Sequence, residues 1–307
     1  MSSLSGHRFG GNWTERKLEA VRYYLEFYAT ALSKQQFDLW YIDAFAGSGE
    51  RTETRTSGGL LEEKSIGIED VVLDGSAKRA MAVTPPFKHL IFMEPDTARY
   101  QVLCKLRDID ARVECQQGDA NTLLPDIFAR SAWRRAGKAK GTQRGVVFLD
   151  PYGMQVSWET LELLAATQRV DVWYLFPLGA VNRQLAHDAG AIDEHKQASL
   201  NRLFGGSAWR SDLYEPDPRT PLFGPPADDQ RAATLEQIET YFHRKLEGLF
   251  SWASPPLPLF LDGGQQVFSL FLLIANDSPA AIQLAKNGMR DLLRKHERQA
   301  FRRRSVP

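Results

Sequence analysis

Hydrophobic and polar positions along the chain follow two different periods, and each period predicts a kind of element. Residues 14–32 place apolar side chains three and four positions apart, which predicts an amphipathic helix capped by Thr14. Short apolar runs with few polar interruptions are typical of buried strands. Five such runs occur, at residues 37–45, 89–94, 112–117, 145–150 and 170–176. Helical patterns separate the last four of them, which predicts a parallel sheet with helices on both faces.

The pattern changes after residue 176. Residues 182–230 are polar and rich in glycine and proline, which indicates an insertion with one or two short helices. A helix, two strands joined by a glycine turn, and a last helix then follow, at residues 234–250, 257–261, 267–275 and 278–294. We expect a Rossmann-like α/β fold whose mostly parallel sheet ends in an antiparallel hairpin, with the insertion between strands five and six.

The same pattern divides the chain into three parts. Residues 1–181 and 231–294 form the expected main domain, which starts with the N-terminal helix. Residues 182–230 form the insertion, a candidate element for recognising a substrate or a partner. Residues 295–307 form a basic tail.

Composition indicates the class of protein and the cellular compartment, but it does not select a function. The 307 residues carry 38 basic and 38 acidic side chains and are 43% hydrophobic, values typical of a globular protein. The only two cysteines, Cys104 and Cys115, indicate a reducing compartment and exclude a zinc site built on four cysteines. The longest apolar run, residues 267–275, is far shorter than a membrane span, and the first residues lack the apolar core of a signal peptide. We therefore expect a cytoplasmic protein without a membrane segment, and the scattered histidines predict no metal.

A glycine-rich turn follows the first predicted strand, in the sequence Tyr-Ile-Asp-Ala-Phe-Ala-Gly-Ser-Gly. Glycines at such a turn let a ligand approach the backbone closely, and an acid at the strand end accepts hydrogen bonds. The candidate cofactor-binding residues are Asp43, Phe45, Gly47 and Gly49. The third glycine of a dinucleotide-binding fingerprint is missing. The alternative is a tight surface turn.

Acidic residues also end the next two predicted strands. Glu94 can hold two ribose hydroxyls, or it can be an exposed acid at a strand end. Asp119 and the neighbouring Ala120 can contact an adenine ring. Asp119 is equally suited to cap the helix that follows, and both roles are compatible.

The fourth motif, Phe-Leu-Asp-Pro-Tyr-Gly, closes the strand at residues 145–150. Asp150, Pro151 and Tyr152 are the candidate catalytic residues, and the alternative is a simple turn. All four motifs fall at carboxyl ends of strands, where open α/β sheets bind ligands. This agreement of position favours a binding site over four unrelated turns.

These motifs resemble those of a known family. The run at residues 12–17, the helix after it, the glycine turn and the Asp-Pro-Tyr motif resemble the three-Cys-motif partner proteins, which are bacterial class I methyltransferase-like proteins. The resemblance covers nearly the whole chain and implies S-adenosylmethionine as cofactor and a three-Cys-motif protein as partner. In amino-group methyltransferases, which the motifs also resemble, the acid and the proline carbonyl accept from the target amine and the aromatic ring stacks on an extruded base.

The motif order is also similar to that of DNA adenine methyltransferases. That similarity implies that Lys17 pairs with the carboxylate of the cofactor, and the alternative is a solvated lysine on an amphipathic helix. One departure concerns the fourth motif, because only Pro151 separates Asp150 from Tyr152, where the related enzymes have two residues.

The sequence thus predicts an S-adenosylmethionine-dependent methyltransferase that acts on an amino group of a nucleic-acid base. Two basic segments, residues 127–149 and 290–304, are candidates for phosphate contacts, and solvated surface is the alternative for both. A second hypothesis is a non-catalytic or conditionally active subunit that binds the cofactor and works with a partner protein, which the shortened fourth motif favours. A third, an NAD-dependent oxidoreductase, is disfavoured by the missing glycine and by the terminal hairpin.

Overall fold

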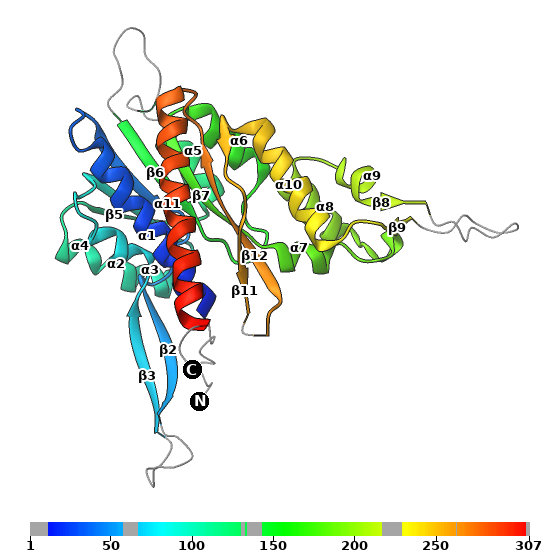
Figure 1. Ribbon diagram of the computed structural model, residues 1–307, viewed down its shortest axis with the longest axis horizontal. Helices are drawn as coiled ribbons and strands as arrows, with labels where there is room; N and C mark the ends of the chain where they lie inside the picture. Colours follow the sequence, from blue (N-terminus) through cyan, green and yellow to red (C-terminus); the bar gives the residue numbers. More distant parts are fainter. Residues whose placement is uncertain are drawn as a thin grey trace, which may run out of the picture.

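A twisted central sheet organises the chain (Figure 1). The computed structural model describes residues 12–57, 67–129, 133, 143–216, 229–261 and 263–304. The sheet has eight strands in the order β10-β12-β7-β6-β1-β4-β5, and β11 pairs with β12. Strands β5, β4, β1, β6 and β7 are parallel, whereas β12 runs antiparallel to β7. This is the expected Rossmann-like, mostly parallel sheet, with its terminal antiparallel hairpin.

The elements follow one another with short connections. The strands of the central sheet are β1 (Asp38–Asp43), β4 (His89–Glu94), β5 (Val113–Gln117), β6 (Gln143–Leu149), β7 (Val170–Phe176), β10 (Trp252–Ala253), β11 (Leu257–Phe260) and β12 (Gln266–Ile274). The helices are α1 (Asn12–Leu32), α2 (Ser76–Met81), α3 (Thr97–Leu103), α4 (Leu106–Ile109), α5 (Ala120–Ala129), α6 (Trp158–Thr167), α7 (Leu178–Gln184), α8 (Glu194–Phe204), α9 (Trp209–Leu213), α10 (Leu235–Leu249) and α11 (Pro279–Arg304).

The segment expected to be a loop after the glycine turn contains a two-stranded antiparallel ribbon instead. Its strands β2 (Glu50–Ser57) and β3 (Gly67–Asp74) pair along their whole length and project from the body in Figure 1. The sequence of β2 holds no apolar residue, so hydrophobic periodicity gave no signal there. Its threonines alternate with charged residues, and β-branched threonine favours strands on its own.

Three helix boundaries also differ from the expected ones. The chain is already helical at Asn12, so Thr14 lies inside α1 and does not cap it. The helix expected at residues 95–107 is broken into α3 and α4. The break lies at residues 104–105, where neither glycine nor proline predicts it. The helix expected to reach Trp133 is described as far as Ala129, and residues 130–132 lie outside the described part of the chain. The last helix, α11, continues past Arg294 to Arg304, because residues 295–304 are mostly good helix formers. Much of the expected tail is therefore helix.

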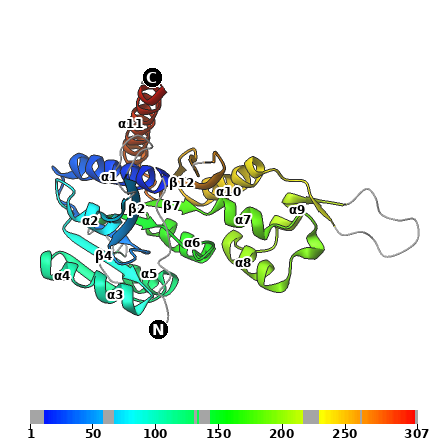
Figure 2. The same ribbon diagram turned by 90° about the horizontal axis from the view of Figure 1, so that it is seen from below.

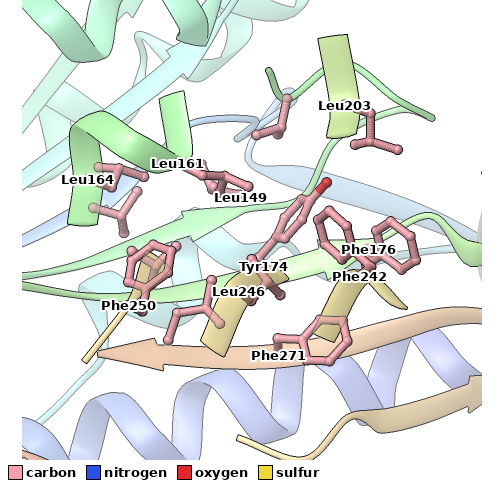
Figure 3. Close-up of a cluster of buried hydrophobic side chains, with 14 of the residues drawn as sticks. Leu149, Leu161, Leu164, Tyr174, Phe176, Leu203, Phe242, Leu246, Phe250 and Phe271 are labelled. Atoms are coloured by element: carbon pink, nitrogen blue, oxygen red, sulfur yellow. The ribbon is translucent and has the colours of Figure 1, made fainter. Parts of the chain in front are cut away.

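Two hydrophobic cores, one on each face of the sheet, hold the layers together. Helices α1 and α11 cover one face, and α5 and α6 lie on the opposite side, as the view along the sheet edge shows (Figure 2). Figure 3 shows the core on the α5 and α6 side of the sheet, which we call the second core. There Phe242 of α10 stacks on Phe176 of β7 with ring centroids 4.1 Å apart. Tyr174 and Phe271 pack around the same ring.

The insertion is docked onto this second core. Leu203, Phe204 and Trp209 are buried in the same cluster as the sheet residues, and Tyr214 is 6% exposed. The aromatic residues Trp209 and Tyr214 therefore pack the insertion onto the sheet, whereas Phe223 lies outside the described residues. The same segment adds a short pair of strands, β8 (Tyr214–Glu215) and β9 (Gln230–Arg231).

Of the basic segment at residues 127–149, residues 130–132 and 134–142 lie outside the described part of the chain. Arg144 is described and stacks over Phe37 near the start of β6, at the edge of the sheet opposite the four motifs. Among the helices that the structure describes, none is long and apolar enough to cross a membrane.

Candidate functional site

The four motifs meet at one edge of the sheet. Asp43 is the last residue of β1, Glu94 is the last residue of β4, and Asp150 directly follows β6. Asp119 comes two residues after β5. Because β6, β1, β4 and β5 are neighbours in that order, their carboxyl ends lie side by side. The structure therefore brings together the acids that the sequence placed in four separate segments.

The turn after β1 is tied to the strands on both sides. The Ala44 N–H donates to the carbonyl of Phe148 on β6 at 3.0 Å, and the Ala46 N–H donates to Met93 of β4 at 2.9 Å. These bonds fix the turn between the two neighbouring strand ends. Ligands at a Rossmann-like sheet bind against such a turn.

The two glycines of the turn serve different purposes. Gly47 and Gly49 have φ angles of 62° and 77°, in the left-handed region that favours glycine. Among the described residues, a Cβ on Gly47 would meet no atom within 4 Å, whereas one on Gly49 would lie 3.1 Å from Leu106. Gly49 is therefore needed for packing, and the backbone at Gly47 borders open space that a ligand can fill.

Asp43 is completely buried beneath this turn. Its carboxylate accepts hydrogen bonds from the Phe45 N–H at 3.2 Å and from the Tyr41 hydroxyl at 3.4 Å. Burial raises the pKa of Asp43 to about 7, while a hydrogen bond from Ser76 opposes the shift. A buried acid with a pKa in this range gains from a cation placed close to it.

Glu94 is 3% exposed at the end of β4. Its carboxylate accepts from the Asp96 N–H at 2.9 Å. Burial raises its pKa, and the Asp96 and Gly47 amides and the Arg99 charge oppose this rise. Glu94 is thus next to the glycine turn, as its expected role requires, and the reading as an exposed acid is wrong.

Asp119 caps the helix that follows it. It accepts from both the backbone and the side-chain amide of Asn121 at 2.8 Å, and Ala120 begins α5 as a buried residue. The Asn121 amide also donates to the Gln155 carbonyl, and its oxygen accepts from Ser157. The cap is therefore observed, and the adenine contact stays a prediction.

Asn121 was not recognised from the sequence. Its bonds join the end of β5 to the loop after β6, across the neighbouring strands. The only available signal was its position two residues after Asp119, which is common in helix caps. Nothing in the sequence pattern marked Gln155, whose side chain accepts from the Tyr152 N–H at 2.9 Å.

Lys17 forms an ion pair with Asp150 across two distant segments. The Lys17 Nζ lies 2.5 Å from Asp150 Oδ2, and the side chains are 5% and 21% exposed. The same Nζ lies 5.2 Å from the ring centroid of Trp13 and 6.0 Å from that of Phe148. The structure thus excludes a solvated lysine and brings α1 into the site.

The rest of the fourth motif forms a turn that presents an aromatic ring. Pro151 is buried, and Gly153 has a φ angle of 67°. Tyr152 is 53% exposed, so it does not pack in the core as a purely structural turn residue would. Arg99 lies over its ring, with the guanidinium carbon 5.4 Å from the centroid. Sequence reasoning missed Arg99, which belongs to α3 and has no motif of its own.

The described residues contain no group of three or more His, Cys, Asp or Glu side chains arranged to hold a metal ion.

Comparison with known proteins finds distant structural similarity. The sequence matches no protein-family model and no curated protein. A Legionella pneumophila protein of the DUF519 family is 14% identical, with 90% of this chain and 91% of that chain covered and a TM-score of 0.48.

Two further solved structures are described as S-adenosylmethionine-dependent methyltransferases. The one from Clostridium acetobutylicum is 9% identical and has a TM-score of 0.32, and the match covers 82% of this chain and 91% of that chain. The one from Methanosarcina mazei is 11% identical and also has a TM-score of 0.32, and the match covers 78% of this chain and 92% of that chain. At this distance the functional reading rests on the strand order and on the site residues.

Proposed function

We propose that this protein binds S-adenosylmethionine and transfers its methyl group to an amino group on a nucleic-acid base. The observation that carries the proposal is the convergence of Asp43, Glu94 and Asp150 at adjacent strand ends, with the buried Lys17 paired to Asp150. Simple surface turns would leave these acids in solvent, whereas Asp43 and Glu94 are buried and Asp150 is paired with Lys17 of α1.

The residues around the glycine turn fit the cofactor. S-adenosylmethionine carries a sulfonium and an ammonium, and the turn has a buried acid whose pKa burial raises to about 7, Asp43. The open space beside Gly47 lets a ligand approach the backbone. In this proposal Glu94 accepts from the ribose hydroxyls, and Asp119 and Ala120 contact the adenine. These residues suit an adenosine with a cationic side chain better than they suit a phosphate.

Bound S-adenosylmethionine supplies an electrophilic methyl group on its sulfonium. In the proposed reaction, Asp150 and the Pro151 carbonyl accept hydrogen bonds from the target NH₂, which orients the nitrogen lone pair. Lys17 holds the Asp150 carboxylate in place through the ion pair. Tyr152 stacks on the acceptor base. As the new N–CH₃ bond forms, the sulfur–methyl bond breaks, the thioether product leaves, and the amine loses one proton to water. Positioning contributes most of the expected acceleration.

The test uses nucleic acid from a strain that lacks the gene. Mass spectrometry of its RNA and DNA nucleosides should reveal the loss of one methylated base. The purified protein should restore that base in the extracted nucleic acid when it is supplied with isotopically labelled S-adenosylmethionine. No difference between the strains, together with no label transferred, would remove the methyl-transfer proposal.

Substituting the proposed orienting acid separates catalysis from folding. Asp150→Ala should lower methyl transfer by at least about 100-fold, since a misplaced acceptor loses that much. Affinity for S-adenosylhomocysteine, measured by calorimetry, should change by less than about fivefold. If the variant transferred methyl groups at the parental rate, Asp150 would not orient the acceptor.

A second candidate is a subunit that binds the cofactor and acts only with a partner protein. The specific feature that favours it is the single residue between Asp150 and Tyr152, and the resemblance to three-Cys-motif partner proteins supplies the kind of partner. A transfer assay with and without that neighbour protein distinguishes the two. Activity that appears only in the mixture supports the second candidate.

A further inference from the structure

Tyr152 stands out among the aromatic residues that the structure describes. Within the described part of the chain only Tyr152 and Phe260 are exposed among the aromatic residues, at 53% and 40%. A large exposed ring that several contacts hold in place requires an explanation, because ordering an exposed side chain costs entropy. The contacts that hold Tyr152 come from two different segments of the site edge.

Arg99 supplies the contact from the cofactor side. It is the third residue of α3, where its N–H donates to the capping Asp96 at 2.9 Å. Its guanidinium carbon lies 5.4 Å from the centre of the Tyr152 ring, and its Nη1 lies 3.4 Å from the Tyr152 hydroxyl. A guanidinium over an aromatic face is an attractive cation–π pair.

This pair bridges two strand ends that are not neighbours. Arg99 follows β4 and Tyr152 follows β6, and β1 with its glycine turn lies between them in the sheet. Gln155 holds the other end of the arrangement by accepting from the Tyr152 N–H. With Arg99 in place, more than half of Tyr152 is still accessible.

Such an arrangement matches a known way of binding an unstacked base. Proteins that bind single-stranded nucleic acid stack bases on aromatic rings and add cation–π contributions from arginine. We propose that Arg99 is a positioning residue, which holds the Tyr152 ring in the orientation that stacking on an unpaired base requires. This inference rests on the proposed function, which already has Tyr152 stack on the acceptor base, and adds the residue that keeps the ring in place.

The test measures base stacking directly, without methyl transfer. Single-stranded RNA and DNA oligonucleotides that carry one 2-aminopurine are titrated with the protein in the presence of S-adenosylhomocysteine, and the fluorescence of 2-aminopurine reports its stacking. The parent should quench it. Tyr152→Leu should weaken binding roughly 5- to 100-fold, whereas Tyr152→Phe, which keeps the ring, should stay close to the parent.

Arg99→Ala should weaken binding by about two- to fivefold and raise the residual fluorescence of the bound base, because the ring is no longer held. Arg107→Ala is the matched control, since Arg107 is an exposed arginine on the neighbouring α4. It should leave both the affinity and the fluorescence unchanged. The RNA and DNA arms show which nucleic acid stacks on Tyr152.

Cofactor titration of the same variants separates the two levels of failure. If S-adenosylhomocysteine binds with parental affinity but no variant alters quenching, the inference is wrong and the cofactor assignment stands. If Arg99→Ala weakens the cofactor and leaves quenching intact, Arg99 belongs to the cofactor site and the inference is overturned. If S-adenosylhomocysteine does not bind the parent at all, the proposed function itself fails.

Discussion

Lys17 is a buried charge whose partner decides its role. The resemblance to DNA adenine methyltransferases assigns it to the cofactor carboxylate, whereas the structure pairs it with Asp150 at 2.5 Å. Lys17 also lowers the pKa of the nearby Asp43, which Asp150 raises. Removing the ammonium therefore leaves two acids close together without the cation that they share.

We predict that Lys17→Met lowers methyl transfer by roughly 10- to 100-fold, because the Asp150 carboxylate loses its alignment. Affinity for S-adenosylhomocysteine should change by less than about threefold if the pairing with Asp150 is the functional one. Lys34→Met, at an exposed lysine just beyond the other end of α1, is the control and should change neither quantity. A tenfold loss of cofactor affinity in Lys17→Met would instead support the carboxylate role.

Gly47 allows a prediction that distinguishes a ligand effect from a folding effect. Among the described residues, a Cβ there meets no atom within 4 Å, so Gly47→Ala should cost only the backbone strain of a φ of 62°, about 1 kcal/mol of unfolding free energy. Cofactor affinity should fall much further, by at least tenfold in calorimetry. A variant that binds the cofactor normally would show that the backbone at Gly47 does not face it.

At the scale of elements, α1 is anchored by a buried hydrogen bond. The Tyr24 hydroxyl donates to Asp171 of β7 at 2.7 Å, and an Arg79–Glu15 ion pair at 2.8 Å ties α2 to the start of α1. Burial raises the pKa of Asp171 to about 7, although the bond from Tyr24 opposes the rise. Burying the ionised form of Asp171 therefore costs free energy of folding. This cost depends on pH because it applies only when the acid is deprotonated.

We predict that this anchor makes the protein less stable as the pH rises from about 4 to about 7. The folded chain keeps a proton on Asp171 over that interval, whereas the unfolded chain releases it, so the free energy of unfolding falls. Asp171→Asn should remove the share of this fall that comes from Asp171, while the share from Asp43, whose pKa burial also raises to about 7, remains. The variant should be more stable than the parent at about pH 8, by roughly 1.4 kcal/mol for each unit of pKa shift. Urea unfolding at about pH 4.5 and about pH 8 measures the effect.

The exposed Asp126→Asn on α5 is the matched control for this experiment and should show the parental pH dependence. A loss of stability in Asp171→Asn at both pH values would contradict the prediction. It would mean that Asp171 is ionised in the folded protein and that the charge itself holds Tyr24.

The elements also show what sequence can and cannot reveal. The buried strands β1, β4, β6 and β7 were visible because each is a short, nearly continuous apolar run with an acid or a turn after it. The ribbon of β2 and β3 was not, because β2 lacks apolar residues and the two strands form a sheet of their own. Hydrophobic periodicity depends on apolar positions, so a strand without apolar residues gives no such signal.

The residues of the candidate site also fall into those that could be predicted from the sequence and those that could not. Residues with a motif at a strand end, such as Asp43, Glu94 and Asp150, could be predicted because position along a strand fixes position at the sheet edge. The Lys17–Asp150 pair and the Arg99–Tyr152 contact could not, since each joins segments far apart in sequence through side-chain geometry. Long-range partners of this kind require the folded structure.

For the whole molecule, the sheet order explains why one edge carries the site. The parallel strands β5, β4, β1 and β6 all end at this edge, and α1 starts there and supplies Lys17. The charges at the edge are mainly acidic, which suits a cationic adenosine cofactor. The antiparallel β12 beside β7 is the arrangement expected of a methyltransferase sheet and unusual for an NAD-binding domain.

Calorimetric titration with S-adenosylhomocysteine, S-adenosylmethionine and NAD tests the central claim most directly. The parent should bind both sulfur nucleosides at one site per chain and give no heat with NAD. Glu94→Ala should weaken that binding by about 1–3 kcal/mol, because hydroxyl donors of the ligand lose their acceptor, while its melting temperature without ligand stays near that of the parent. Binding of NAD with no heat from either sulfur nucleoside would contradict the account.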